Sequence, residues 1–502
     1  MTLTSFWFIS AFIISLVIYY AIPRKLQWVS MLMFSLLFFI VSSRPVTVIY
    51  LALSVVSVTI VCRILNRTKS KAALISGVVI NLGMLCVLKY ADFFVGNFNW
   101  LSATFGSSFE IPVVKWVAPI GISFYTMQIL AYLLDVYWEI TVPQQGIMRT
   151  ALFVSYWPQL TSGPIARHNE MKDQLYSEKA FSWKNVTFGL QRMMWGIFKS
   201  LVISNRLGIM VDTIYENTIK YNGLYIWFAA AMFLLQLYTD FSGCMDIVIG
   251  ASECYGIVLP ENFKTPFFSR SVQEYWQRWH ITLGTWFKDY IFYPLSVNKS
   301  IIKFGKKVRE KGFAELGRRI PIYVPMLFVW ILTGMWHGSE SRFVVWGLCN
   351  YVFIVLGTEL EGVSAKIVTA LRLKETGFVM KSYRAFKTFW LMSMLRLFDI
   401  NKTPGEALKA FRYIFTDWRG FDVVKVYEQL SLPYEDFVVA LIAIAVLFVF
   451  EMIQRKGSIR KRIFAMPVPL QWVILSILIV AVSVFGYYGP GYDAQSFIYG
   501  AF

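Results

Sequence analysis

The sequence holds three histidines, His168, His280 and His337, and they are the first candidates for proton-transfer chemistry. His337 ends an apolar run, in LTGMWHGSES, between Gly334 and Gly338. These two glycines lack side chains, so we expect them to let a substrate approach the imidazole. An ionisable residue at membrane depth predicts a functional site, because its burial costs free energy. The alternative is a buried histidine that is bonded to a backbone carbonyl.

His280 stands in a segment rich in aromatic and charged side chains, QEYWQRWHITLGTWFKDY at 273–290. If these residues form one helix, an apolar stripe recurs at three- and four-residue steps at Trp276, Trp279, Leu283 and Trp286 or Phe287. A neighbouring polar face then carries Gln273, Gln277, His280 and Gly284. We therefore expect His280 to face an internal cavity. The alternative is an amphipathic helix at the membrane surface with an aromatic belt.

Arg278 is expected to have a separate role, because helical geometry turns it about 200° away from His280. It then lies near Glu274 and Asp289. This position predicts a local ion pair for the guanidinium group, or contact with a phosphate or a lipid headgroup.

Composition indicates what kind of scaffold positions these side chains. The chain has 502 residues, of which 57% are hydrophobic and 16% are charged, and its mean hydropathy is +0.55. Soluble proteins rarely have this balance, so we predict a polytopic, all-α protein of the cell membrane, with 1–502 forming a single membrane domain of about a dozen helices. Apolar runs near the ~20 residues that a helix needs to cross a bilayer lie at 5–22, 27–42, 46–62, 72–90, 116–137, 187–205, 223–250, 320–337, 343–358, 386–398, 437–453 and 470–488.

The net charge of +18 does not indicate nucleic-acid binding, because the basic residues gather in loops between the apolar runs. The positive-inside rule places such loops in the cytoplasm. The basic loops lie at 24–25, 63–71, 299–319, 366–387 and 455–462. Both termini are then extracytoplasmic, together with 92–115, 206–222 and 401–436, although the 401–436 loop also carries several Lys and Arg residues.

The remaining chemistry-bearing residues give no metal or phosphate motif. The cysteines stand singly in or beside apolar runs, which predicts core residues: Cys62, Cys86, Cys244, Cys254 and Cys349. The sequence has no Cys-x-x-Cys motif and no cluster of histidines, so we expect no metal site. It also lacks a glycine-rich phosphate loop, which disfavours an ATP-driven pump.

Four segments resemble the membrane-bound O-acyltransferase (MBOAT) superfamily: APIGISFYTMQILAYLLDVYW at 118–138, YWPQLTSGPIARHNEM at 156–171, the stretch from LQLYTDFSG to WFKDYIFYPL at 235–295, and LTGMWHGSESRFVVWGL at 332–348. They are most similar to a bacterial branch that acylates extracytoplasmic polymers. This branch includes the alginate and peptidoglycan O-acetylation proteins and the teichoic acid D-alanyl transfer protein. The resemblance implies a catalytic core at 118–350, and re-entrant or interfacial segments around a central tunnel.

The resemblance implies that His337 matches the catalytic histidine of the family and that His280 matches its second histidine. His337 is then the general base for an attacking hydroxyl group, since an imidazole has an ordinary pKa of ~6.5. His280 is expected to orient or polarise the thioester carbonyl. His168 follows GPI-x-R, where relatives often carry a tyrosine, so no catalytic role is implied for it. Further polar positions are expected to line the substrate tunnel: Asp240, Asn262, Gln277 and Arg278.

The same resemblance implies a donor and an acceptor on opposite sides of the membrane. The donor is a cytoplasmic acyl thioester, acetyl-CoA or an acyl carrier protein, which acts as substrate, and no bound cofactor is expected. The acceptor is an extracytoplasmic polysaccharide, reached with the help of an extracytoplasmic transferase partner. The final residues FIYGAF resemble a terminal segment whose tyrosine is a proposed acyl carrier, here Tyr499, although Gly500 departs from the aromatic residue expected. The alternative for Tyr499 is an aromatic anchor at the membrane interface.

Three other functions stay open. D-alanyl transfer to teichoic acid is the nearest, but the chain length and the extension after 360 are more similar to the acetylating proteins. A transporter or flippase also explains many spans and polar residues such as Asp240 and Asp246, but no inverted repeat is visible. A structural subunit of an envelope complex needs neither His280 nor His337. Cleavage of an acyl thioester separates the enzymes from the other two classes.

Overall fold

The computed structural model describes residues 2–114, 116–216, 223–418 and 432–488. Regular structure in these ranges is helical, and the β contact within them is an isolated antiparallel bridge between Phe263 and Trp279. The prediction of an all-α fold is therefore confirmed.

The chain forms two compact units. The first unit consists of Met1–Met193 and Cys244–Pro260, and the second unit consists of Met194–Gly243 and Glu261–Phe502. The chain passes from one unit to the other within α8 (Trp183–Phe198) and within α10 (Gly223–Cys254). Both units therefore contain part of the predicted catalytic core at 118–350. The placement of 401–436 outside the cell stays a prediction.

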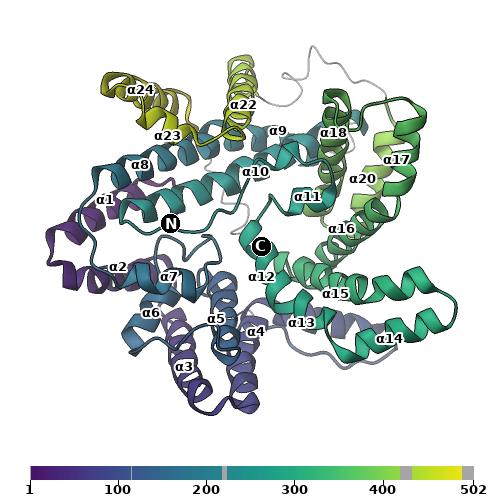
Figure 1. Ribbon diagram of the computed structural model, residues 1–502, viewed down its shortest axis with the longest axis horizontal. Coiled ribbons are helices and arrows are strands. Elements are labelled where there is room, and N and C mark those ends of the chain that lie inside the picture. Colours follow the sequence, from purple (N-terminus) through teal and green to yellow (C-terminus); the bar gives the residue numbers. More distant parts are fainter. Residues whose placement is uncertain (1, 115, 217–222, 419–431, 489–502) are drawn as a thin grey trace. The chain divides into compact units, whose positions relative to one another are not determined.

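The first unit is a set of helices held by close packing. Its further elements are η1 (Arg24–Leu26), α1 (Phe6–Ala21), α2 (Gln27–Ser42), α3 (Thr47–Thr68), α4 (Lys71–Thr104), α5 (Ile122–Tyr137), α6 (Ile147–Ser155) and α7 (His168–Leu175). Helices α3, α4 and α5 pack against one another (Figure 1). A Cβ atom on Gly77 of α4 would come within 2.9 Å of Val61 and 3.2 Å of Leu133. Glycine therefore allows these three helices to approach closely.

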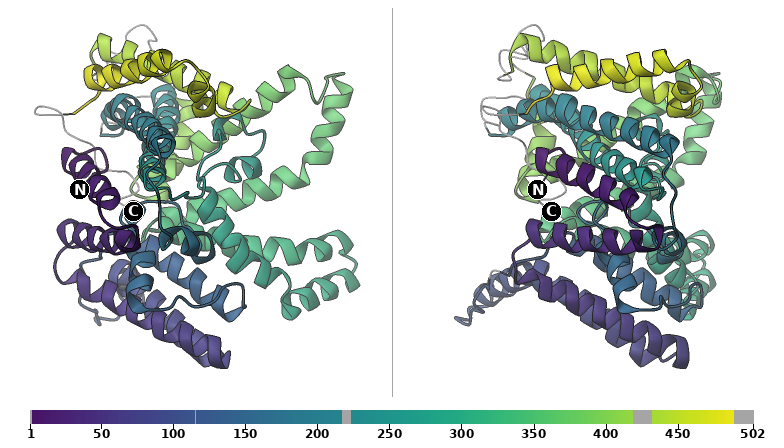
Figure 2. Two further views of the ribbon diagram at one scale, coloured as in Figure 1. Left: turned by 60° about the vertical axis from the view of Figure 1, so that its left-hand side comes forward. Right: turned by 90° about the vertical axis from the view of Figure 1, so that its left-hand side faces the viewer.

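The second unit begins with the end of α8, which continues through a π-helix, η2 (Lys199–Ser204), into α9 (Asn205–Glu216). After α10 follow η3 (Pro266–Phe268), α11 (Val272–Trp276), α12 (Ile281–Phe287), the π-helix η4 (Lys288–Phe292), α13 (Tyr293–Ser296), α14 (Lys299–Glu310), α15 (Ala314–His337), α16 (Ser341–Glu359), α17 (Glu361–Ala370), α18 (Phe378–Leu395), α19 (Leu397–Ile400), α20 (Pro404–Thr416), α22 (Tyr434–Gln454), α23 (Ile459–Phe464) and α24 (Val468–Phe485). Figure 2 shows α22 and α24, in yellow, alongside the teal helical stretch that contains η2 and α9, which they contact.

Eight of the described helices are long and apolar enough to span a membrane: Arg24–Ser42, Thr47–Thr68, Lys71–Thr104, Gly223–Cys254, Ala314–His337, Ser341–Glu359, Tyr434–Gln454 and Val468–Phe485. The other four expected runs give shorter or more polar helices. Helix α1 has 16 residues, which at 1.5 Å per residue falls short of the ~30 Å hydrocarbon core. Helix α5 also has 16 residues, the 187–205 run changes from α-helix to π-helix, and α18 carries Lys381, Arg384 and Lys387.

Helix α15 packs against both α14 and α16 through backbone contacts at glycine (Figure 1). A Cβ atom on Gly305 of α14 would lie 2.6 Å from the carbonyl oxygen of Gly317. A Cβ atom on Gly347 of α16 would overlap the carbonyl oxygen of Trp330. Contacts between backbones leave little room for adjustment, so the end of α15 has a defined position relative to α16.

Candidate active site

His337 is the last residue of α15, and it is buried between two indole rings. The exposed fraction of the residue is 5%. Its ring centroid lies 5.2 Å from that of Trp336 and 4.8 Å from that of Trp346, which projects from α16. Both contacts have an edge-on geometry, with interplanar angles of 84° and 68°. The close α15–α16 packing therefore brings Trp346 to the histidine.

The glycines beside His337 have a different role from the one expected. A Cβ atom on Gly334 would overlap the carbonyl oxygen of Phe343, and one on Gly338 would overlap the Phe343 ring. The space that we assigned to an approaching substrate is thus occupied by the first turn of α16. Gly334 and Gly338 serve helix packing, so the expectation that they admit a substrate is wrong.

His280 lies in a break between two helices, because α11 ends at Trp276 and α12 begins at Ile281. Its backbone is left-handed, with φ 49° and ψ 51°. The segment pairs instead with residues 262–264: the Lys264 N–H donates to the Arg278 carbonyl over 2.9 Å, and the Ile281 N–H donates to the Asn262 carbonyl over 3.0 Å. This pairing satisfies backbone groups that a continuous helix would otherwise satisfy.

The expectation of one helix over 273–290 is therefore wrong, and so is the shared polar face that it implied. Gln273 and Gln277 are exposed, whereas His280 is 2% exposed. The apolar positions are also buried against protein rather than spread on a membrane surface, with Trp279 at 1% and Trp286 at 5% exposure.

Asn262 fixes the orientation of the His280 ring. Its Oδ1 atom accepts hydrogen bonds from the backbone N–H and the hydroxyl group of Thr282, each over 3.0 Å, and lies 3.2 Å from Nδ1 of His280. A backbone N–H only donates, which identifies the Asn262 atom as the carbonyl oxygen. An oxygen without hydrogen only accepts, so Nδ1 of His280 carries the proton in this contact. The lone pair of the neutral ring is then on Nε2.

The two histidines meet at one side chain. The His280 ring centroid lies 5.5 Å from that of Trp336, which also contacts His337, with their ring centroids 5.2 Å apart. Phe241 of α10 covers the His280 ring at 4.8 Å. All of these residues belong to the second unit. Two buried imidazoles that flank one indole are suited to moving a proton in a site that excludes water.

The other predicted tunnel residues do not share one environment. Asn262 is fully buried at His280, and Asp240 is buried on α10 with 8% exposure. Gln277 is exposed in the turn after α11. A tunnel-lining role for the four predicted side chains stays a prediction.

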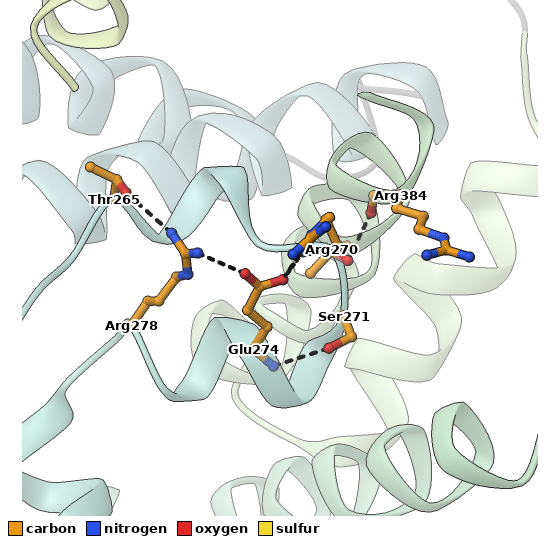
Figure 3. Close-up of polar contacts among 7 residues, drawn as sticks. Thr265, Arg270, Ser271, Glu274, Arg278 and Arg384 are labelled. Carbon is orange, nitrogen blue, oxygen red and sulfur yellow. Dashed lines mark hydrogen bonds and ion pairs between the residues drawn. The ribbon is translucent and has the colours of Figure 1, made fainter. Parts of the chain in front are cut away.

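Arg278 forms the local ion pair that its position predicted. Its Nη2 atom donates to Oε1 of Glu274 over 2.7 Å, and Nη1 lies 3.4 Å from the hydroxyl oxygen of Thr265. Figure 3 shows the Glu274 carboxylate between Arg278 and Arg270, whose backbone N–H donates to Oε2 over 2.7 Å. The pair closes the turn that leads into His280, and Arg278 is thus part of the support of that turn.

Comparison with known proteins relates this chain to one family. Residues 144–306 match the membrane-bound O-acyltransferase family, MBOAT. A peptidoglycan O-acetyltransferase of Helicobacter pylori is 31% identical over 303 residues, which cover 55% of this chain and 53% of the relative. A probable alginate O-acetylase, AlgI, of Azotobacter vinelandii is 28% identical over 371 residues, or 74% of this chain and 68% of the relative. These matches show that the chain is similar to the membrane-bound O-acyltransferase family over residues 144–306.

A less similar relative has a different named substrate. A teichoic acid D-alanyltransferase of Bacillus subtilis is 27% identical over 252 residues, or 48% of this chain and 60% of the relative. The match to the Helicobacter pylori protein spans about half the length of that relative, 53%. The match to a membrane-bound family and the eight apolar helices among the described residues indicate a multi-pass membrane protein, as the composition predicted.

The sequence analysis missed the side chains that support His280 and His337. Trp346 contacts His337 edge-on and also contacts Arg396, whose guanidinium carbon Cζ lies 5.3 Å from the Trp346 ring centroid. Arg396 is 2% exposed and pairs with Asp399 over 2.6 Å. The spacing of three residues between Arg396 and Asp399 is a sequence signal for such a pair. No signal in the sequence connects either residue with Trp346.

The remaining chemistry-bearing residues lie elsewhere. His168 is in the first unit, stacked on Tyr132 at 4.1 Å, with Nδ1 3.4 Å from the Thr141 hydroxyl oxygen. The five cysteines form no disulfide with one another, and the described residues contain no cluster of potential metal ligands. Tyr499 lies outside the described residues.

The buried state of His280 predicts acid sensitivity. Burial lowers the pKa of His280 from 6.5 to about 3. Between these two pH values the unfolded chain binds a proton that the folded protein does not, so stability is complete above about pH 6.5 and falls as the pH is lowered toward 3. We expect the thermal unfolding midpoint in detergent to fall less between about pH 7.5 and about pH 5 in His280→Asn than in the unaltered protein. Equal shifts in the two proteins would contradict this assignment.

Proposed function

We propose that this MBOAT protein transfers an acyl group, specifically acetyl, from a cytoplasmic thioester across the membrane for O-acylation of an extracytoplasmic cell-envelope or secreted polysaccharide. The observation that carries the proposal is the convergence of His280 and His337 on Trp336 in a buried part of the second unit. Burial among indoles is consistent with a water-excluded reaction site, in which acyl transfer can compete with hydrolysis of the donor.

The proposed chemistry gives each histidine a distinct role. A hydroxyl oxygen attacks the thioester carbonyl carbon, and His337 accepts the hydroxyl proton as general base. The C–S bond breaks as the C–O bond forms, and the thiolate leaves with that proton as a free thiol. Polarising the thioester carbonyl would need an N–H donor, but the Nδ1 proton of His280 faces Asn262. Its Nε2 lone pair accepts instead, which favours an orienting role for His280 toward a hydroxyl group.

The choice of acetyl over D-alanyl follows the named activities of the relatives. The peptidoglycan O-acetyltransferase and the probable alginate O-acetylase align over 55% and 74% of this chain, and the D-alanyltransferase over 48%. The acceptor is accordingly a polysaccharide of the envelope or a secreted one. An extracytoplasmic transferase partner completes the transfer in this proposal.

The proposal is tested with the purified full chain and a panel of labelled donors. Acetyl-CoA, an acetylated carrier protein and a D-alanylated carrier protein are supplied separately, and release of free thiol is measured together with label on the protein. We expect thiol release from one of the two acetyl donors. Release from the D-alanyl donor alone would replace acetyl by D-alanyl transfer. Label that crosses a liposome membrane without thioester cleavage would instead indicate a transporter.

Tyr499 is proposed as the first acceptor of the acyl group. Its phenol oxygen would attack the thioester, which gives an aryl ester that a partner could deacylate. After incubation with donor, we expect mass spectrometry of the C-terminal peptide to find one acetyl group, about 42 Da, on Tyr499. The peptide of Tyr499→Phe should carry none. An unmodified Tyr499 together with full polymer acylation by Tyr499→Phe would reject the carrier role and leave His337 chemistry intact.

A further inference from the structure

The π-helix η2 and the first turn of α9 hold the end of the described chain. Residues 485–487, at the end of α24, contact this stretch through side-chain and backbone hydrogen bonds. Helix α24 also packs against η2. π-helical turns are rare and frequently occur at functional sites, which makes this contact a candidate for a specific role.

Arg206 is the centre of the contact. Its guanidinium group donates to Oδ1 of Asp436, at the start of α22, from Nε over 2.9 Å and lies 2.8 Å from it through Nη2. Nη1 donates to the carbonyl oxygen of Phe485 over 2.5 Å and to that of Val202 over 3.1 Å. The ring of Tyr487 lies 5.0 Å from Cζ. One side chain therefore connects α9, α22 and the end of α24.

The backbone of Tyr487 is held on both of its polar groups. Its N–H donates to the carbonyl oxygen of Leu201 over 3.0 Å. Its carbonyl oxygen accepts from Nδ2 of Asn205 over 3.2 Å. A carbonyl inside an α-helix is normally bonded within the helix, and the i to i+5 register of a π-helix alters that pattern. The π-helix thus supplies an acceptor for a chain segment from outside.

Burial explains why this contact is specific. The side chain of Arg206 is 5% exposed, and a buried guanidinium group is stable only when its donors are satisfied. Two of its acceptors, Asp436 and the Phe485 carbonyl, come from segments distant in sequence. Displacement of residues 485–487 would leave a buried charge with fewer partners, so the bound arrangement is strongly favoured.

The same π-helix is also connected with the histidine site through contacts with α10. Lys199, its first residue, donates to the Ser242 hydroxyl over 2.8 Å and lies 5.8 Å from the ring of Tyr238, both on α10. The Tyr238 ring lies 5.8 Å from that of Trp279, next to His280. Lys199 and Arg206 are seven positions apart, or about 10 Å along a helix. The contact that holds Tyr487 and the support of the histidine site are therefore built on one short helical stretch.

We propose that Arg206 is a positioning residue that holds residues 485–487 at a fixed point of the second unit, so that the segment after them starts within reach of the histidine site. This inference rests on the proposed carrier function of Tyr499. Tyr499 is twelve residues beyond Tyr487, and twelve residues span at most about 40 Å. A fixed starting point restricts the volume that the phenol explores and raises its effective concentration at the site.

The experiment compares Arg206→Met with Arg206→Lys and with a matched control. Arg206→Met removes every hydrogen-bond donor of the guanidinium group. Arg206→Lys keeps the positive charge next to Asp436, but an ammonium group lacks the planar set of donors that bonds Asp436 and the Phe485 carbonyl at the same time. Arg192→Met is the control, because Arg192 forms a comparable ion pair with Asp246 over 2.9 Å in the first unit. Two readouts are used: acylation of Tyr499 by mass spectrometry, and hydrogen exchange of a peptide that covers residues 486–488.

We expect Arg206→Met to lower the rate of Tyr499 acylation by about tenfold or more and to speed the exchange of the Tyr487 amide, while thioester hydrolysis by water changes less than about twofold. Arg206→Lys is expected to give the same pattern with a smaller change, and it decides the matter if Arg206→Met does not fold. Arg192→Met should leave both readouts unchanged.

The two readouts separate the two ideas. Unchanged exchange at Tyr487 in a folded Arg206 variant would overturn the positioning role, whatever happens to acylation. Faster exchange with undiminished Tyr499 acylation would also overturn it. Absence of an acyl group on Tyr499 in the unaltered protein would reject the carrier function instead, and the exchange measurement would still test the anchoring of residues 485–487.

Discussion

His337→Ala is expected to lower thioester cleavage by on the order of 10²–10⁴-fold, because general-base catalysis by a positioned side chain contributes that much. The imidazole stands at the end of α15 between Trp336 and Trp346, and no other described histidine except His280 shares this cluster. Water cannot readily replace the lost base in a site with 5% exposure. The measurement is release of free thiol by the purified protein from the labelled acetyl donor, acetyl-CoA or acetylated carrier protein, that the unaltered protein cleaves.

Two further variants separate loss of the base from loss of the fold. His337→Gln keeps a polar side chain of similar size but cannot accept a proton near neutral pH, so we expect nearly the same loss as with alanine. His168→Gln is the matched control: it removes another buried histidine, stacked on Tyr132, and should lower stability while retaining most of the activity. Activity of His337→Gln above about a tenth of that of the unaltered protein would exclude a general-base role.

Gly334→Ala is expected to produce the second large loss, through geometry alone. Its Cβ atom would overlap the backbone carbonyl oxygen of Phe343. A Cβ atom is fixed to the backbone of α15 and the carbonyl oxygen is fixed to that of α16, so neither can rotate away and the two helices must separate. Overpacking of this kind typically costs about 1–3 kcal/mol of stability. Separation also moves Trp346 away from His337, and a displacement of about 1 Å near a reacting group can lower the rate on the order of 10²-fold.

Gly357 of α16 offers the control for this variant. It has no neighbour within 4 Å of a Cβ position, and it is exposed near the end of the helix. Gly357→Ala should therefore keep full thiol release and a thermal unfolding midpoint equal to or above that of the unaltered protein, since alanine is favoured over glycine in helices. Equal behaviour of Gly334→Ala and Gly357→Ala would show that the α15–α16 contact does not position His337.

The helical scaffold was predictable because hydrophobic runs of bilayer length have few alternatives. The run at 320–337 and the run at 343–358 lie within α15 and α16, the helices that present His337 and Trp346. The ion pair of Arg278 with Glu274 was predictable for a similar reason, since it depends only on local spacing of four residues. Local patterns thus gave the helices and the contacts that stay within one turn.

Contacts between distant segments were not predictable from the same patterns. The periodicity of 273–290 suits a helix, but hydrogen bonds to 262–264 break it at His280. Gly334 and Gly338 beside a histidine suggested open space, and only the path of α16 shows that Phe343 fills it. In both cases a partner in another segment decided the outcome: residues 262–264 precede the helix break, and Phe343 belongs to the next helix, α16. Helical periodicity around the residue itself does not indicate how that other segment folds back onto it.

The left-handed backbone at His280 has a consequence for how this position tolerates change. Asparagine and glycine adopt such dihedral angles at low cost, whereas alanine is less suited and valine or isoleucine is strongly disfavoured there. A substitution at position 280, where φ is 49°, therefore changes the backbone preference together with the side chain. A β-branched replacement would redirect the chain toward Ile281 as well as remove the ring, so the set of residues compatible with this corner is narrow whatever reaction the site performs.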